Sequence, residues 1–166
     1  MSVMGRTVLV ALMSCAACAD VDVPELPELH IVTWQDQPLL DEYSDGASVW
    51  RPLGFRITTA PSRPECVRDW YVQGDYDCTI TIGVQRDPLL RERAGTNALS
   101  NRAERSIVID SELTNAYDLT LAMAHEVGHI VLDTAEHTSG GVMGGASAVL
   151  TSVDYEFACR AIGVCL

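Results

Sequence analysis

Lysine is missing from this sequence, and positive charge of any kind is scarce. The 11 basic residues are all arginine and stand against 23 acidic residues, so the formal net charge of the 166-residue chain is -12. A chain of this charge repels nucleic acid and anionic lipid surfaces. We therefore expect no nucleic-acid partner. The hydrophobic content of 48% is that of an ordinary globular protein and excludes wholesale disorder.

The N-terminus lacks an apolar run long enough to span a bilayer as a helix. Its run "TVLVALM" follows Arg6 and ends in small residues, which is the pattern of an export signal. Ala17-Cys18-Ala19 fits a small-x-small cleavage site, whereas "LMSC" resembles a bacterial lipobox with Cys15 as the lipidated residue. We slightly favour the lipobox. The predicted protein is exported, either secreted or lipid-anchored at the bacterial cell envelope, and touches the membrane only through that anchor.

Internal repeats and low-complexity tracts are absent, and no large segment precedes the first predicted strand. Residues 1–19 are assigned to the export signal, and residues 20–29, which are acidic and punctuated by proline, to an extended spacer. Residues 30–166 suffice for one domain with its own core. We predict a single-domain monomer without a pro-domain or an accessory domain.

The four cysteines that follow the signal contain no C-x-x-C pair, which argues against a cysteine metal site. An even number of cysteines in an exported protein favours disulfide bonds instead. The sequence allows three pairings, and we favour the two local ones, Cys66 with Cys78 and Cys159 with Cys165.

Alternation of apolar and polar residues between turn-forming residues predicts the strands. They are expected over residues 30–34, 55–59, 78–85, 96–100 and 106–110, with a turn near 100–101 between the last two. Only a weak helix is expected over 47–51, because a glycine interrupts the surrounding pattern. A final helix is expected over 152–161.

A long helix is predicted after Asn115, a good N-cap, with Asp118 at the position that reaches back to the cap. One face of this helix is apolar and consists of Leu119, Met123, Val127, Ile130 and Val131. Another face carries two histidines among further apolar residues. The helix is therefore predicted to be buried at the centre of the domain, with Met123 in the core.

Three of the four histidines lie within thirteen positions, and His125, Glu126 and His129 form an H-E-x-x-H arrangement. Residues four apart share a helix face with Cβ atoms about 5–6 Å apart, so two imidazoles can converge on one ion. Glu126 is displaced around the helix and can act as a base toward water at the metal. The alternative is a pair of core histidines with an exposed glutamate, which is disfavoured because burying polar groups without partners is costly.

The third ligand is less obvious. Asp133 continues the four-residue series, but on a straight helix it would lie roughly 12 Å along the axis from His125, too far to share an ion. His137 is favoured, because imidazole is the stronger ligand type at such a site. Glu136 and Glu156 remain as alternatives. The fourth histidine, His30, is assigned a structural or surface role.

These residues resemble the metzincins, and within them the matrixin-like and small bacterial secreted zinc peptidases. That family has the pattern H-E-x-x-H-x-x-G-x-x-H, followed by a methionine in a tight turn, the Met-turn. His125 and His129 match the first two zinc ligands, Glu126 the general base, and Met143 in "GGVMGG" the Met-turn methionine. The resemblance covers most of residues 30–166.

The resemblance implies an α+β fold of zincin type. Its parts are a twisted mixed sheet with an edge hairpin, a central active-site helix that carries H-E-x-x-H, the Met-turn and a C-terminal helix. It also implies one catalytic zinc ion, and a peptide substrate that lies extended along the edge strand near residues 96–100.

The chain departs from the family pattern at two positions. Leu132 stands at the glycine position and Ala135 at the third-ligand position, so that His137 arrives two residues late. We expect the longer turn over residues 133–136 to reverse the chain without any residue taking the positive φ that the glycine adopts.

The sequence thus predicts a zinc metalloendopeptidase with Glu126 as general base, acting on a protein or peptide substrate. Two alternatives stand beside it: a non-catalytic zinc-binding surface lipoprotein of the same fold, and a zinc hydrolase of non-peptide substrates. Tyr155 is assigned to the core of the last helix rather than to the reaction.

Overall fold

A computed structural model of the chain describes residues 26, 28–33, 37–59, 80–163 and 165. Its elements follow the order β1 (Glu28–Thr33), α1 (Asp41–Ser48), a 3-10 turn (Arg51–Leu53), β2 (Arg56–Thr59), β3 (Ile80–Asp87), α2 (Leu90–Ala94), β4 (Ala98–Asn101), β5 (Ser106–Asp110), α3 (Ala116–Val131) and α4 (Ser152–Ile162). The predicted export signal, the lipobox at Cys15 and the Cys66–Cys78 pair lie outside the described residues.

One five-stranded sheet forms the framework, with the strand order β2-β1-β3-β5-β4. The first four strands in this order run parallel, and β4 pairs antiparallel with β5 at the edge. This confirms the predicted mixed sheet with an edge hairpin. Strand β4 has a sheet partner on one side only, and it also contacts helix α3.

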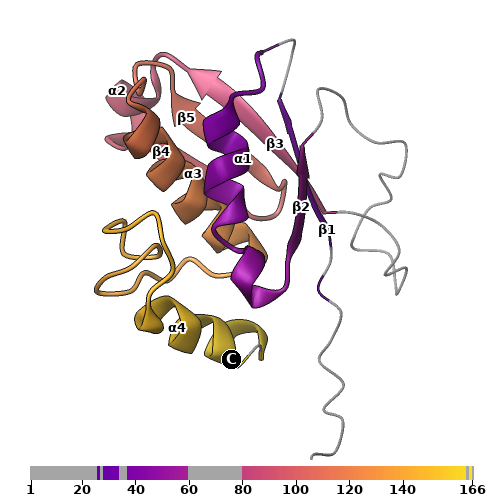
Figure 1. Cartoon of the computed structure of the whole chain (residues 1–166). Coiled ribbons are helices and arrows are strands. Elements are labelled where there is room, and N and C mark those ends of the chain that lie inside the picture. The colour runs from indigo at the N-terminus through magenta and orange to yellow at the C-terminus, as the bar shows by residue number, and fades with distance from the viewer. Residues whose placement is uncertain (1–25, 27, 34–36, 60–79, 164, 166) are drawn as a thin grey trace, which may run out of the picture.

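Helices α1 and α3 lie side by side on one face of the sheet, and α4 lies beyond their ends, apart from the sheet (Figure 1). The predicted apolar face of α3 is buried along its whole length. Met123 is completely buried, as expected for a core residue. The helix that carries the histidines is therefore held by contacts with both α1 and the sheet.

The helix predicted over 47–51 was placed wrongly, because α1 begins at Asp41 and ends at Ser48. Gly46 was taken as an interruption, yet it lies inside α1. A Cβ atom at this position would lie 2.7 Å from the Cβ atom of Met123 and 2.7 Å from the carbonyl oxygen of Thr120. Glycine is therefore required here for the close approach of α1 to α3, and that contact outweighs its low helix propensity.

A second glycine, Gly128, allows α3 to pack closely against two core side chains. The place of its missing Cβ is taken by the indole ring of Trp50 and the sulfur of Met143, both completely buried. The indole Nε1 of Trp50 also donates a hydrogen bond of 2.8 Å to the carbonyl oxygen of Ala124. Contacts at Ala124 and Gly128 thus fix the helix backbone directly before each of the two histidines.

Other elements also differ from the prediction. Strand β1 begins at Glu28, inside the predicted spacer, because its pairing with β2 starts at that residue. The short helix α2 was not predicted; the carboxylate of Asp87 accepts a hydrogen bond of 2.8 Å from the amide of Leu89 ahead of it, and Gly95 ends it at φ 67°. The hairpin turn lies at residues 102–105 rather than 100–101, since β4 continues to Asn101.

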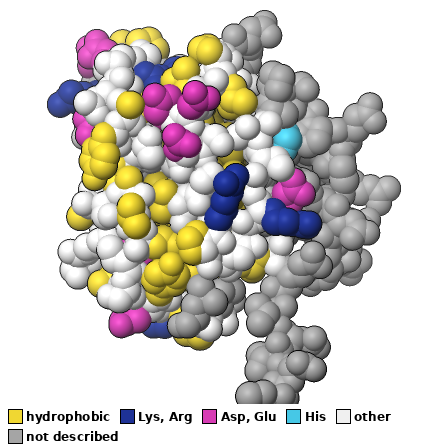
Figure 2. Space-filling view, viewed as in Figure 1, with side chains coloured by type: hydrophobic (Ala, Val, Ile, Leu, Met, Phe, Trp, Pro, Cys, Tyr) yellow, Lys and Arg dark blue, Asp and Glu magenta, His cyan; other side chains and the backbone are white. Residues whose placement is uncertain are grey.

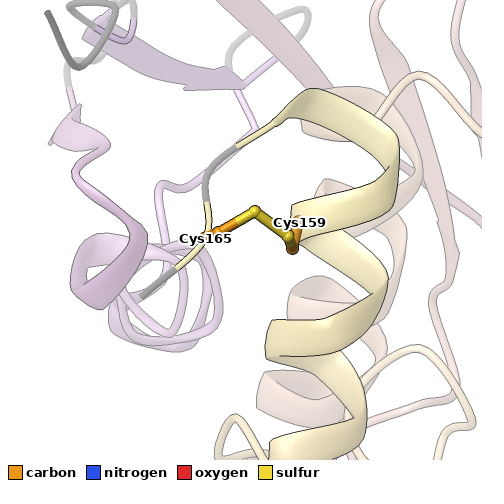
Figure 3. The surroundings of a disulfide bond; sticks show 2 residues. All are labelled: Cys159 and Cys165. Carbon is orange, nitrogen blue, oxygen red and sulfur yellow. A yellow bond between two sulfur atoms is a disulfide. The ribbon is translucent and has the colours of Figure 1, made fainter. Parts of the chain in front are cut away.

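The disulfide predicted between Cys159 and Cys165 is present and closes the end of α4 (Figure 3). In the part of the chain that the structure describes, none of the helices has the length and apolar character needed to cross a membrane.

Candidate metal centre

Helix α3 presents His125 and His129 from successive turns. Its start is fixed by the predicted N-cap Asn115, whose side-chain oxygen accepts a hydrogen bond of 3.1 Å from the amide of Asp118. The fixed start and the 3.6-residue turn of the helix bring the two rings to one side. Their ring centroids are 4.7 Å apart, and the ring planes are perpendicular.

His137 completes a triangle of imidazoles. Its ring centroid lies 5.1 Å from that of His125 and 4.8 Å from that of His129. One ring nitrogen from each histidine lies within 4.8 Å of the other two. Among the described residues, these three histidines form the group whose side chains could hold one metal ion.

The hydrogen bonds of His125 and His129 fix which nitrogen each ring presents. Nδ1 of His125 lies 2.9 Å from the carbonyl oxygen of Val142, and Nδ1 of His129 lies 2.8 Å from that of Thr134. A carbonyl oxygen can only accept, so each Nδ1 carries the proton. When such a ring is neutral, its Nε2 carries no proton and offers a lone pair, as a metal ligand must.

These two Nε2 atoms face one another at 3.1 Å. If both rings are neutral with Nδ1 protonated, they cannot hydrogen-bond through Nε2, and the two atoms then face one another as acceptors. Two nitrogens bound to one zinc ion at about 2.0–2.1 Å in a tetrahedral site are about 3.3 Å apart. The observed separation fits a shared ion.

The largest separation in the group involves His137, because the other two Nε2 atoms are only 3.1 Å apart. Two zinc–nitrogen bonds can bridge at most about 4.2 Å. His137 is exposed, and closing this gap requires its ring to move toward the other two. The donor set of three imidazoles fits zinc.

The burial of His129 favours its neutral, metal-binding form. His129 is buried, and this desolvation lowers its pKa, with the neighbouring rings of His125 and His137 lowering it further against the opposing effect of the Thr134 carbonyl and of Glu126. A lowered pKa keeps the imidazole neutral at neutral pH and ready to bind a cation. Glu126 is also buried, with 7% of its surface exposed.

Helix α3 ends in a turn that contradicts one sequence expectation. Asp133 has φ 44°, so a residue of the longer turn does adopt the left-handed conformation. The amide of Thr134 bonds to the carbonyl of His129 at 3.1 Å, and that of Asp133 to Ile130 at 3.3 Å, the two bonds of a Schellman cap. Leu132, at the family's glycine position, has φ -93°. The sharp turn is thus kept and moved one residue later, and aspartate tolerates it better than most residues.

This cap gives a stability prediction. Asp133→Gly should raise the free energy of unfolding by about 0.5–1 kcal/mol, because glycine removes the left-handed strain while the backbone carbonyl that Arg102 binds is retained. Thermal unfolding of the zinc-free protein measures it. Asp45→Gly, in the middle of α1, is the matched control and should lower stability by about 0.5 kcal/mol or more. Equal losses in both variants would contradict this account of the turn.

Met143 lies in the turn over residues 141–145, which Asp154 of α4 holds in place. The completely buried carboxylate of Asp154 accepts hydrogen bonds of 3.1 Å from the amides of Val142 and Met143. It also accepts 2.8 Å bonds from the amide and the hydroxyl of Thr151. A Cβ on Gly141, which has φ 71°, would collide with this carboxylate. Since Val142 supplies the carbonyl that orients His125, Asp154 supports the histidine from behind.

Asp154 was not recognised in the sequence. The available signal was "TSVD" at the start of the last helix, a capping pattern like that of Asn115 and Asp118, separated from the glycine-rich turn by residues 146–150. The pattern predicts a helix start, but nothing local shows that this carboxylate is buried against the turn.

The other candidate ligands lie elsewhere. Glu136 and Glu156 are both exposed and do not belong to the histidine group. Asp133 follows the end of α3, and its side chain, 88% exposed, pairs with Arg102 at 3.3 Å. His30 bonds to the hydroxyl of Thr58 at 2.7 Å, in a structural role. Tyr155 is half-buried against the core.

A cavity of about 340 Å³ joins the three histidines to the edge strand. It is lined by Thr96, Ala98, Leu99, Ser100, Arg102, His125, Glu126, His129, Thr134, Ala135 and His137. A group bound at the histidines would therefore lie between Glu126 and the free edge of β4.

Comparison with known proteins supports the fold. No protein-family model matches the chain, and no curated protein sequence matches it. Among solved structures it is similar to an archaemetzincin from Methanopyrus kandleri, at 15% sequence identity and a TM-score of 0.53. The match covers 86% of this chain and 99% of that one. At this identity the likeness concerns the fold alone, and it lends no support to a specifically matrixin-like chain; the fold is a mixed α/β fold similar to that of an archaemetzincin.

Proposed function

We propose that the chain is a zinc-dependent metallopeptidase. The observation that carries the proposal is the triangle of imidazoles in which two Nε2 lone pairs face one another, beside a buried glutamate in a cavity open to a strand edge. His125, His129 and His137 are the proposed ligands, and the similarity to an archaemetzincin fold is consistent with them. Met143, packed against Gly128, is the proposed Met-turn methionine.

Bound zinc supplies Lewis-acid chemistry, which polarises a peptide carbonyl and acidifies water. The side chains and carbonyls of the protein supply the proton transfer and hold the histidine rings in place. Glu126 takes a proton from the attacking water and returns it to the leaving amine. Its burial beside His125 limits competing solvent, and the carbonyls of Val142 and Thr134 keep the rings of His125 and His129 from turning.

Strand β4 is the proposed platform for the substrate. Its residues Ala98, Leu99 and Ser100 line the cavity that contains the histidines. An extended peptide can pair with the free edge of this strand through main-chain hydrogen bonds, which hold it without selecting a sequence. The backbone of the peptide would then pass between β4 and Glu126.

We also propose that the protein acts outside the cytoplasm. The signal pattern over residues 1–19 supports this location, and so does the Cys159–Cys165 disulfide, since such bonds persist in oxidising compartments.

The test measures zinc binding and peptide cleavage together. The purified protein should bind one zinc ion per chain, cleave members of a mixed peptide library, lose cleavage on chelation and regain it with zinc. His137→Ala should weaken zinc binding by more than about 100-fold, beyond the effect of losing a residue that only orients a ligand. Glu136→Ala, an exposed neighbour, is the control and should leave zinc binding unchanged.

The zinc-binding and cleavage results distinguish the peptidase from the two alternative functions. Zinc bound without cleavage of any peptide would overturn the peptidase and favour the binding protein or a hydrolase of other substrates. Loss of zinc in the Glu136 variant and not in the His137 variant would overturn the ligand set.

A further inference from the structure

Two cavities meet at His125 and Glu126, and they extend in opposite directions along β4. The first, of about 340 Å³, runs toward Ser100 and Arg102. The second, of about 280 Å³, includes Asn97 and the first turns of α3. Because the two share His125, Glu126, Thr96 and Ala98, together they form one groove with the proposed reaction centre in its middle.

The two ends of this groove carry opposite charges. Arg102 lines the first cavity and is the basic side chain among its lining residues. Asp118 lines the second and is the acidic side chain there besides Glu126, which lines both. The groove therefore has a cationic end and an anionic end, although the whole chain has a net charge of -12.

Arg102 retains the capacity to bind a ligand. Its Nη1 donates 2.9 Å to the carbonyl of Asp133 and lies 3.3 Å from the carboxylate of the same residue. That carboxylate is 88% exposed, so the ion pair contributes little. A guanidinium has five N–H donors, and the bonds to Asp133 hold this one at the groove while other donors can bind a substrate carboxylate.

Charged side chains of both signs also lie outside the groove. On the face shown in Figure 2, acidic and basic side chains occur in small separate groups, without a continuous patch of one sign. Charge selection in a peptide would depend on Arg102 and Asp118, which are exposed at the two ends of the groove, and it should therefore weaken at high salt.

The direction of β4 determines which side of the cut lies near Arg102 and which lies near Asp118. The strand runs from the Asp118 end of the groove to the Arg102 end. Antiparallel pairing is the more stable and more frequent arrangement for an added strand. A substrate paired in this way places residues before the scissile bond near Arg102 and residues after it near Asp118.

Resting on the proposed peptidase function, we propose that Arg102 and Asp118 are specificity-determining residues. The groove selects peptides with an acidic side chain on the N-terminal side of the cut and a basic side chain on the C-terminal side. Arg102 binds the carboxylate, and Asp118 binds the cation.

The test uses four fluorogenic peptides that differ only in the residues flanking the cut: Glu before and Lys after, the reverse order, and Gln in place of each charge in turn. The zinc-loaded wild-type enzyme should cleave the first with kcat/KM about tenfold above its Gln-before counterpart. The reversed peptide should be the poorest substrate. Peptide affinities of the Glu126→Gln protein, measured by fluorescence anisotropy, should follow the same order.

Substitutions at Arg102 and Asp118 test which residue produces each charge preference. Arg102→Gln should abolish the preference for Glu before the cut and leave that for Lys after it, while Asp118→Asn should do the reverse. Arg91→Gln changes the same charge on exposed α2, outside both cavities, and should alter neither preference.

Two outcomes would overturn the proposal: cleavage with equal efficiency for all four peptides, or a preference that Arg102→Gln and Asp118→Asn leave intact. A reversed wild-type preference that both variants abolish would overturn the antiparallel orientation. Cleavage of none of these peptides, nor of any in the mixed library, would instead count against the peptidase function itself.

Discussion

Glu126→Gln should lower kcat/KM for peptide cleavage by about 100- to 10,000-fold while the protein still binds one zinc ion. The side chain is buried beside His125 and outside the group of three ring nitrogens, so it is placed to move a proton rather than to hold the metal. Glutamine keeps its shape and removes its basicity. Steady-state kinetics and zinc content, measured on the same preparation, test both halves of this expectation.

Glu136→Gln is the matched control, since Glu136 lies one residue before His137 but is exposed. It should leave kcat/KM within about twofold of the wild type, as expected for a surface change away from the reacting atoms. If the Glu126 variant keeps full activity, the base must lie elsewhere. If it loses its zinc, Glu126 is a ligand and the three-histidine set is wrong.

Asp154→Ala should lower the free energy of unfolding by about 3–5 kcal/mol, the cost of breaking a buried charged network. The substitution leaves the amides of Val142 and Met143 without their acceptor inside the core. Because the carbonyl of Val142 orients His125, zinc affinity should fall as well, by about 10- to 100-fold. Denaturant unfolding measures the first effect and competition with a chelator the second.

A milder variant keeps this prediction testable if the alanine variant does not fold. Asp154→Asn should retain part of the network and lose roughly 2 kcal/mol, with a smaller drop in zinc affinity. Asp118→Asn is the matched control, because Asp118 holds the same N3 position at the start of α3 but is exposed. It should change stability by less than about 1 kcal/mol. A loss of stability without any change in zinc affinity would show that Asp154 supports the turn but not His125.

Much of the fold could be predicted because its signals are local. The apolar face of α3, its cap at Asn115 and the alternation in β5 need only residues within a few turns or positions of one another. The placement of α1 failed for the opposite reason. Gly46 weakens a helix by local propensity, and only the contact with Met123 explains why a glycine is needed there.

The turn after α3 shows the same limit. The sequence indicated that the family's glycine is missing, and we expected a turn without positive φ. The structure places Asp133 in that conformation, because the Schellman bonds from Asp133 and Thr134 close the helix end and aim the Thr134 carbonyl at His129. Residue type shows that aspartate tolerates a positive φ, but it does not show that this turn places Asp133 there.

The sequence by itself determined that His125, Glu126 and His129 lie on one helix, since 3.6 residues per turn fix their relative directions. Only the tertiary structure decided that His137 rather than Glu136 or Glu156 joins them, because the path of a turn depends on what it packs against. The two N3 aspartates make the same point. Asp118 and Asp154 follow similar capping patterns, yet one is exposed and the other is completely buried against the Met143 turn. Local bonding starts both helices, and long-range packing alone makes one of these carboxylates part of the support of the histidine group.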